Sequence, residues 1–297
     1  MELCLGTVQF GMNYGIFNQE KKEPEYCLKC LDYATQNGIS AIDTATAYGI
    51  AESITGTFLK RKTIPRDKLF ISTKFSPNLL DNCDPSEYEN IIRENLLNSL
   101  KTLNTDYVDA YFLHSSRYAF QFEILEALNI VQKDGLAKKI GVSVYYPDEA
   151  KACFDSGVVQ YIQMPYSIFD HRMKEHDIIT RAHDVNCCVD VRTVFIKGLI
   201  RLGYDEVPTH LSKAIPILKK LDKICADTGF TRVELDMGYV KRESIIKHLV
   251  FGVRTIEQLK ENITSFDKEI PEAIFVEMDK EFSGIPTDLV VPSLWVK

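Results

Sequence analysis

Short apolar runs alternate with longer amphipathic stretches along the whole chain. Apolar runs bounded by turn residues are typical of buried strands, whereas apolar residues spaced by three and four are typical of helices. On this basis we predict eight strands, at residues 3–7, 39–42, 69–73, 107–113, 139–144, 158–164, 187–195 and 249–252. The predicted helices cover 24–36, 51–62, a long stretch that starts at 84–85, 120–133, 148–156, 170–184, 212–227, 233–241 and 255–265.

This alternation predicts the architecture. Strands that alternate with helices are parallel and joined by right-handed crossovers. Eight such units in 297 residues favour one closed (β/α)8 TIM barrel, an α/β fold, with residues 1–297 as a single domain. A doubly wound sheet is the alternative, but no G-x-G-x-x-G sequence follows any predicted strand.

Composition limits the classes of partner. The net charge of -7 argues against nucleic-acid binding, although it leaves room for a local basic pocket that takes an anionic cofactor. No apolar run approaches the roughly 20 residues that span a bilayer. No signal peptide is visible, so the eight cysteines indicate reduced thiols in a cytoplasmic protein, and we expect no metal site.

Four reactive side chains follow three consecutive predicted strands. Asp43, Lys74 and His114 each end an apolar run, and Tyr48 lies in the loop beyond the first of them. The carboxyl ends of barrel strands open on one face, so these four side chains should meet there. The alternative is that these residues have only structural roles, in which Asp43 caps a turn and Tyr48 is a packing residue.

These residue types suit proton transfer to or from an oxygen. A phenol has a pKa of about 10, and we expect the ammonium of Lys74 to lower that of Tyr48. Asp43 would keep Lys74 charged, and His114 would orient a carbonyl oxygen. No serine or cysteine nucleophile accompanies them, which favours carbonyl–alcohol interconversion with a hydride from a cofactor.

The segments A-I-D-T-A-T-A-Y-G, I-S-T-K-F and Y-F-L-H-S resemble the three signature blocks of the aldo-keto reductase superfamily. The resemblance runs from Leu5 to about Asn262 and implies a TIM barrel with a nicotinamide cofactor, usually NADPH. The catalytic tetrad of the family matches Asp43, Tyr48, Lys74 and His114. The N-terminal hairpin that closes the barrel in many relatives is not expected, because Met1 adjoins the first strand.

The resemblance also implies a cofactor site. Ser143 and Gln163 would contact the carboxamide, and Arg192 would replace a tyrosine that stacks on the nicotinamide. Val144 stands where the family commonly has asparagine, and Arg254 is the one cation of the last block before Lys260. The implied cofactor-binding residues are Gly6, Thr7, Asp43, Ser143, Gln163, Arg192, Thr193, Phe195, Lys197, Gly198, Gly252, Arg254, Gln258, Glu261 and Asn262.

The predicted function is NAD(P)H-dependent reduction of an aldehyde, ketone or sugar carbonyl by a monomer or weak homo-oligomer. NADPH should be favoured, with measurable use of NADH. The alternative is a regulatory subunit that binds NADPH with little turnover. Outside the site, we interpret His171, His176 and His183 as surface residues of one helix, and Trp295 either covers the pocket or packs.

Overall fold

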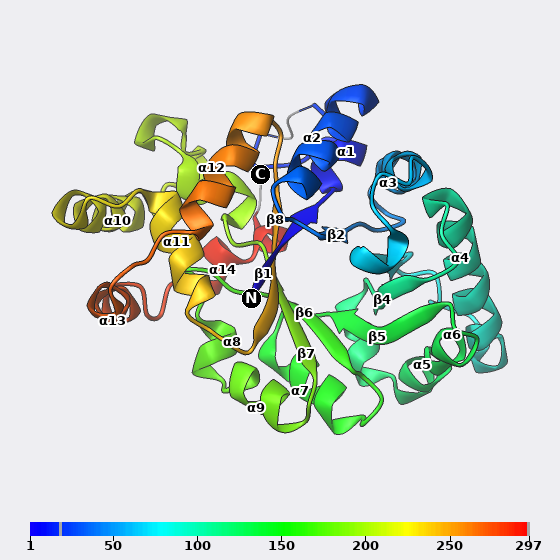
Figure 1. The fold of residues 1–297 in the computed structure, drawn as a ribbon. Coiled ribbons are helices and arrows are strands. Elements are labelled where there is room, and N and C mark those ends of the chain that lie inside the picture. The colour runs from blue at the N-terminus through cyan, green and yellow to red at the C-terminus, as the bar shows by residue number, and fades with distance from the viewer. Residues whose placement is uncertain (18–19, 296–297) are drawn as a thin grey trace.

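The computed structural model of the protein describes residues 1–17 and 20–295. Eight parallel strands lie at its centre and helices surround them (Figure 1). The first and last strands pair, with Cys4 opposite Val250, and this pairing closes the barrel. The predicted (β/α)8 barrel is therefore confirmed. Its strands are β1 (Glu2–Gly6), β2 (Ala41–Asp43), β3 (Phe70–Phe75), β4 (Val108–Leu113), β5 (Ala137–Ser143), β6 (Tyr161–Pro165), β7 (Cys188–Arg192) and β8 (Ile246–Gly252).

Helices form the outer layer, and several 3-10 turns lie in the loops. The α-helices are α1 (Val8–Gly11), α2 (Pro24–Gln36), α3 (Ala51–Lys60), α4 (Tyr88–Leu103), α5 (Phe122–Ala127), α6 (Asn129–Lys133), α7 (Pro147–Asp155), α8 (Arg172–Glu175), α9 (Ile178–Asp184), α10 (Ala214–Thr228), α11 (Arg232–Lys241), α12 (Ile256–Phe266), α13 (Glu272–Glu281) and α14 (Thr287–Val290). The 3-10 helices are η1 (Arg66–Lys68), η2 (Pro85–Glu87), η3 (Ser116–Phe120), η4 (Ile196–Arg201), η5 (Tyr204–Glu206), η6 (Thr209–Leu211) and η7 (Pro292–Leu294).

Three element boundaries differ from the prediction for identifiable reasons. Strand β3 continues through Lys74, so this lysine lies inside the strand instead of ending it. Strand β7 ends at Arg192 because Thr193 has a left-handed backbone, with φ of 63°. The helix predicted over 170–184 is broken into α8 and α9 at Asp177, which also has positive φ.

The interpretation of His171 as a surface residue is wrong. Its ring is buried and stacks on Tyr239 with 5.0 Å between centroids, and its Nε2 lies 2.8 Å from the carbonyl oxygen of Ile168. His176 and His183, by contrast, are exposed. His171 lies just before α8, which begins at Arg172, and its ring packs against Tyr239 of α11, so it does not belong to the exposed face of the predicted helix.

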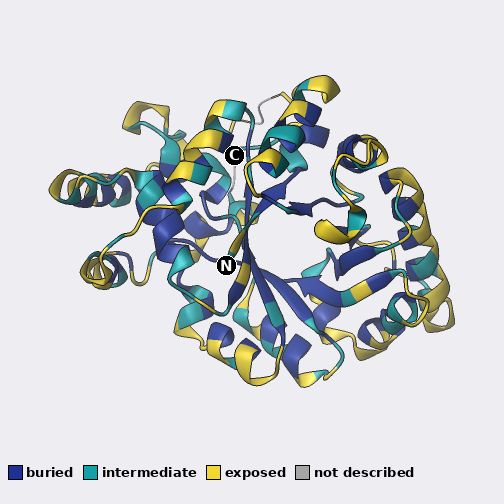
Figure 2. Cartoon of the chain, in the orientation of Figure 1, coloured by how far each residue is buried: buried dark blue, intermediate teal, exposed yellow. Residues whose placement is uncertain are grey.

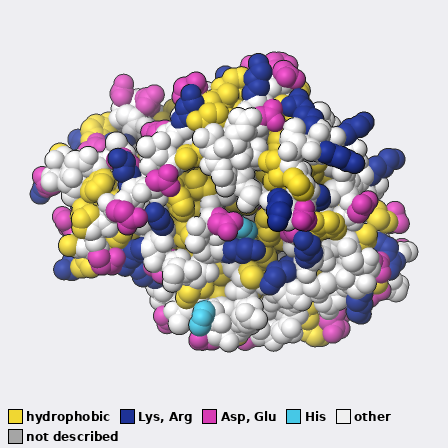
Figure 3. Space-filling model, in the orientation of Figure 1, with side chains coloured by type: hydrophobic (Ala, Val, Ile, Leu, Met, Phe, Trp, Pro, Cys, Tyr) yellow, Lys and Arg dark blue, Asp and Glu magenta, His cyan; other side chains and the backbone are white. Residues whose placement is uncertain are grey.

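Burial follows the layers of the barrel. The strands are almost entirely buried, and each outer helix is buried on its inward side and exposed on the other (Figure 2). Acidic and basic side chains are interspersed over the face seen in Figure 3. Within residues 1–17 and 20–295, no helix is long and apolar enough to cross a membrane.

A polar cluster fills part of the barrel interior. The Tyr161 hydroxyl donates to Oδ1 of Asp190 at 2.6 Å, and Nδ1 of His248 lies 2.8 Å from the same oxygen. All three side chains are buried. Tyr161 lies two residues before Gln163 on β6, and both face the interior, so the cluster lies one layer below the strand ends where Gln163 lies.

The acid Asp236, on α11, is also fully buried and generates a prediction. Its Oδ1 accepts a hydrogen bond of 3.0 Å from the backbone N–H of Ile168, and burial raises the pKa of Asp236 to about 8. An aspartate in an unfolded chain ionises near pH 3.9. The stabilisation from the protonated side chain is therefore complete below about pH 4 and is lost as the pH rises to about 8.

We expect Asp236→Asn to flatten the pH dependence of stability, because asparagine keeps the acceptor and cannot ionise. Between about pH 5 and about pH 8, the parent should lose at least ~1 kcal/mol more unfolding free energy than the variant. Urea unfolding at both pH values measures this. The exposed Asp106→Asn is the control and should follow the parent. Identical losses in the parent and Asp236→Asn would contradict the assignment.

Candidate active site

Asp43 and Lys74 form a buried ion pair at the centre of the barrel mouth. The Lys74 ammonium donates to both carboxylate oxygens at 2.6 Å and to the carbonyl oxygen of Thr44 at 3.0 Å. Oδ1 of Asp43 also accepts from Ser72 Oγ at 3.0 Å and from Gln163 Nε2 at 2.9 Å. A second donor from β3 and one from β6 thus fix the carboxylate, and the carboxylate fixes the ammonium.

The loop that carries Tyr48 is held by close backbone packing against α1. A Cβ atom on Gly11 would lie 1.6 Å from the Tyr48 carbonyl oxygen, and one on Gly49 would lie 2.3 Å from the Gly11 carbonyl oxygen. Gly49 also has φ of 57°, a conformation that glycine adopts readily. Two glycines therefore allow the Tyr48 loop to lie directly on the segment that follows β1.

Tyr48, Lys74 and His114 converge. The Lys74 ammonium lies 5.1 Å from the centroid of the Tyr48 ring. The His114 ring meets the Tyr48 ring edge to face, with 5.6 Å between centroids and an angle of 82°. Asp43, Tyr48 and His114 line one cavity, while Lys74 is fully buried behind its wall. The structure thus brings the four residues predicted from the sequence into one cluster.

The protonation states follow from burial. Burial, and secondly the Asp43 carboxylate, raise the pKa of Tyr48 above its usual value, so the expected lowering by Lys74 is not the net effect. The charge of Lys74 is neutralised by Asp43, which explains why it does not dominate. Burial and the charge of Lys74 lower the pKa of His114 to about 3. At neutral pH, the phenol is therefore protonated and the imidazole is neutral.

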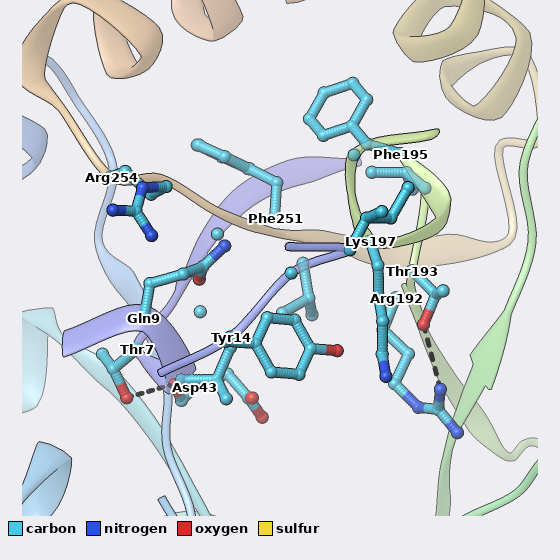
Figure 4. Close-up of a pocket in the computed structure, with 18 of the residues that line it drawn as sticks. Thr7, Gln9, Tyr14, Asp43, Arg192, Thr193, Phe195, Lys197, Phe251 and Arg254 are labelled. Carbon is cyan, nitrogen blue, oxygen red and sulfur yellow. Dashed lines mark hydrogen bonds between the residues drawn. The ribbon is translucent and has the colours of Figure 1, made fainter. Parts of the chain in front are cut away.

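The cavity beside this cluster has a volume of about 310 Å³, and its lining includes Tyr48 as well as Gln258 and Asn262 of α12. Figure 4 shows Asp43, Tyr14, Arg192 and Arg254 among the residues that line it. Its lining includes four cationic residues, Arg192, Lys197, Arg201 and Arg254, and two acidic ones, Asp43 and Glu206. Because Asp43 is neutralised by Lys74, the lining is locally basic in a protein whose net charge is -7. Such a cavity favours an anionic ligand.

The segment after β7 forms one wall of the cavity. Arg192 donates to Ser143 Oγ at 3.2 Å and to the Val144 carbonyl oxygen at 2.9 Å, and its guanidinium lies 4.1 Å from the centroid of the Tyr145 ring. Thr193 and Lys197 both have positive φ, at 63° and 54°. Strained backbone of this kind clusters at ligand sites.

Buried polar atoms along the cavity supply a test of whether a nicotinamide dinucleotide fits. Among the described residues, Oε1 of Gln9, Oε1 of Gln163 and Nδ2 of Asn262 have no hydrogen-bond partner, and all three residues line the cavity. Buried polar groups are normally paired, so these atoms indicate a polar ligand. Together with the basic lining, they fit a ligand that carries amide, hydroxyl and phosphate groups.

The sequence also matches a known protein family. The model of the aldo/keto reductase family matches residues 2–281. The chain belongs to the aldo/keto reductase family. The resemblance noted in the sequence is thereby confirmed.

Individual relatives agree with this assignment. An oxidoreductase of Bacillus subtilis, YrpG, is 27% identical over 97% of this chain and 91% of its own length. The NADH-specific methylglyoxal reductase of Escherichia coli is 26% identical over 84% of this chain and 85% of its own length. A solved aldo-keto reductase from Bacillus halodurans, in its holo form, has the same fold, with a TM-score of 0.77 at 22% identity over 94% of this chain and 91% of its own.

All but one of the residues implied as cofactor-binding lie along the cavity, and the exception is Glu261. Val144, which stands where the family commonly has asparagine, accepts a hydrogen bond from Arg192 through its carbonyl oxygen. Trp295 is not in the lining either, and its indole N–H donates to the Leu289 carbonyl oxygen. The lining residues from the implied set are Gly6, Thr7, Asp43, Ser143, Gln163, Arg192, Thr193, Phe195, Lys197, Gly198, Gly252, Arg254, Gln258 and Asn262.

Five polar lining residues were not predicted from the sequence: Gln9, Tyr14, Tyr145, Arg201 and Glu206. Gln9 lies over the end of β8, where a Cβ atom on Gly252 would be 2.0 Å from its Oε1 (Figure 4). Its side chain therefore fills the space that the glycine leaves. The one feature of the sequence that could have indicated Gln9 is that it lies two residues after Thr7. Arg201 lies in a stretch without periodicity, so no such feature indicates it.

The buried pair gives the next prediction. Lys74→Met leaves the Asp43 carboxylate buried without its counter-charge, so we expect a loss of roughly 3–5 kcal/mol in unfolding free energy. The double variant Asp43→Asn/Lys74→Met removes both charges and should regain more than half of that loss. Denaturant unfolding compares the two, with the exposed Lys68→Met as the control. If the double variant is less stable than Lys74→Met, charge compensation is not the main effect of this pair on stability.

Proposed function

We propose that the protein is an NAD(P)H-dependent reductase that converts an aldehyde, ketone or sugar carbonyl to the alcohol. The observation that supports this most directly is the contact of Tyr48 with both Lys74 and His114 at the wall of a basic cavity. Membership of the aldo/keto reductase family points to the same chemistry. A bound nicotinamide would supply the hydride.

In this proposal Tyr48 donates the proton. Its raised pKa keeps the hydroxyl protonated at neutral pH, and the hydroxyl is then available to the oxygen that becomes the alcohol. The Lys74 ammonium, 5.1 Å from the ring centroid, would stabilise the phenolate left after transfer. Asp43 positions that ammonium and keeps it charged.

His114 would bind the substrate oxygen. As a neutral imidazole it can donate one hydrogen bond, and its Nδ1 has no partner within the described part of the chain. A neutral donor orients a carbonyl without competing with Tyr48 as the proton source. The name of the Escherichia coli relative makes methylglyoxal the first substrate to test.

The cofactor would lie along the cavity. Ser143 and Gln163 would hold the carboxamide, the Arg192 guanidinium would stack on the nicotinamide, and the segment 193–198 would bind the phosphates. At the other end, Arg254 donates to the backbone oxygen of Glu20 at 2.9 Å, so its charge is available to a 2′-phosphate. We therefore propose that NADPH is preferred and that NADH is also used.

Two further inferences concern the molecule as a whole. The pairing of β1 with β8 supports a single domain over residues 1–297. The eight cysteines are all free thiols, which supports a cytoplasmic location. We also propose that the protein is a monomer or weak homo-oligomer.

The competing function is a subunit that binds NADPH with little turnover. Both functions use the same cavity, and turnover alone separates them. We expect Tyr48→Phe to lower kcat by at least about a hundredfold, because only the transition state uses the acidity of the phenol. Its affinity for the cofactor should stay within a few-fold, since the hydroxyl is not used to hold the dinucleotide.

The measurement is steady-state reduction of methylglyoxal and a panel of carbonyl compounds, followed by NADPH absorbance. Tyr14→Phe removes a second phenol from the same cavity and is the matched control, with a loss at least tenfold smaller. Activity of Tyr48→Phe within tenfold of the parent would refute the proton donor. A parent that reduces nothing but binds NADPH tightly would favour the binding subunit.

A further inference from the structure

Arg201 lies at the end of the cavity that is remote from Tyr48. It ends η4, after β7, and its guanidinium lies 4.5 Å from the centroid of the Phe195 ring. Nη1 donates to Oε2 of Glu261 at 2.5 Å, and Nη2 donates to Oδ1 of Asn262. Arg201 thus joins the segment after β7 to helix α12 across this end of the cavity.

This contact places the Arg201 guanidinium one helical turn along α12 from Gln258, which binds the Arg254 backbone. Gln258 lies at the start of α12 and accepts a hydrogen bond of 2.9 Å from the backbone N–H of Arg254. Glu261 and Asn262 follow Gln258 by three and four residues, so they lie on the same face of the helix, one turn along. Arg201 and Arg254 therefore both lie beside this face.

The two arginines differ in how their charge is compensated. Arg254 bonds to a neutral backbone oxygen and, within the described residues, forms no ion pair. Arg201 is paired with the Glu261 carboxylate, and the side chains are 22% and 47% exposed. The positive charge of Arg201 is therefore largely neutralised, although its guanidinium still faces the cavity.

Resting on the proposed function, we infer that the Arg201–Glu261 ion pair determines how strongly the site prefers a cofactor with a 2′-phosphate. Arg201 is a second binding group for this phosphate, and Glu261 limits its effect by neutralising it. The phosphate also meets the N-terminal end of α12, where the helix dipole favours negative charge. Preference for NADPH is then modest because one of the two cations is already paired.

Variants on either side of the ion pair should change the preference in opposite directions. Glu261→Gln frees the charge of Arg201, so the ratio of NADPH to NADH affinity should rise at least about threefold. Arg201→Met removes the charge, and the ratio should fall at least about threefold.

Isothermal titration calorimetry of each cofactor with the full chain measures these ratios without turnover. Contacts that both cofactors share, including any to the adenine, affect both affinities equally and therefore do not change the ratio. Asp267→Asn, at the other end of α12, changes the net charge by the same amount as Glu261→Gln and is its control. Its affinity ratio should stay within twofold of the parent. Arg254→Ala should lower NADPH affinity at least tenfold and leave NADH affinity nearly unchanged.

Three outcomes are informative. Opposite changes with Glu261→Gln and Arg201→Met support the inference. Equal losses for both cofactors in both variants overturn it, since Arg201 would then only hold the segment after β7 in place. A parent that binds neither cofactor instead overturns the proposed function, and this result is distinct from an unchanged ratio.

Discussion

The site depends on one interaction, the buried ion pair between Asp43 and Lys74. Neither charge would be stable alone in the barrel interior, since an unpaired buried charge costs several kcal/mol. Their bidentate contact, reinforced by Ser72 and Gln163, converts two costly groups into a rigid unit. The unit is built from strands β2, β3 and β6, so the closed barrel itself sets the position of the ammonium beneath Tyr48.

Around this rigid centre, the loops contribute the groups that contact ligands. Tyr48 reaches the mouth through a loop packed on Gly11, and Arg192 is fixed at the end of β7 by Ser143 and Val144. The segment from Thr193 to Arg201 adopts a strained backbone and crosses to helix α12. This division agrees with the general organisation of barrel enzymes, in which strands give precision and loops give specificity.

The order of strands and helices could be predicted from the sequence because each buried strand is a short apolar run between turn residues. The positions of Asp43, Tyr48, Lys74 and His114 followed from the strand ends and the family resemblance. Three-dimensional contacts could not be predicted in this way. The buried position of His171 depends on its stacking contact with Tyr239 of α11, and the raised pKa of Tyr48 depends on burial outweighing the charge of Lys74.

Residues on irregular segments escaped the sequence analysis for the same reason. Arg201 has no periodic context, and its role depends on a contact with Glu261 some 60 positions later in the chain. Gln9 takes its place because Gly252, on the last strand, leaves space for an amide from helix α1. Both contacts join segments that are distant in sequence, and only the closed barrel brings them together.

The central claim is that the Tyr48 cluster and the basic cavity together perform hydride transfer. The most direct measurement uses NADPH carrying deuterium at the transferable C4 position, incubated with methylglyoxal and a carbonyl panel, with products analysed by mass spectrometry. We predict that a reduced product gains one deuterium on the former carbonyl carbon, with one cofactor molecule oxidised per product. If no product contains deuterium although calorimetry shows tight cofactor binding, the protein is a nicotinamide-binding module and the account is wrong.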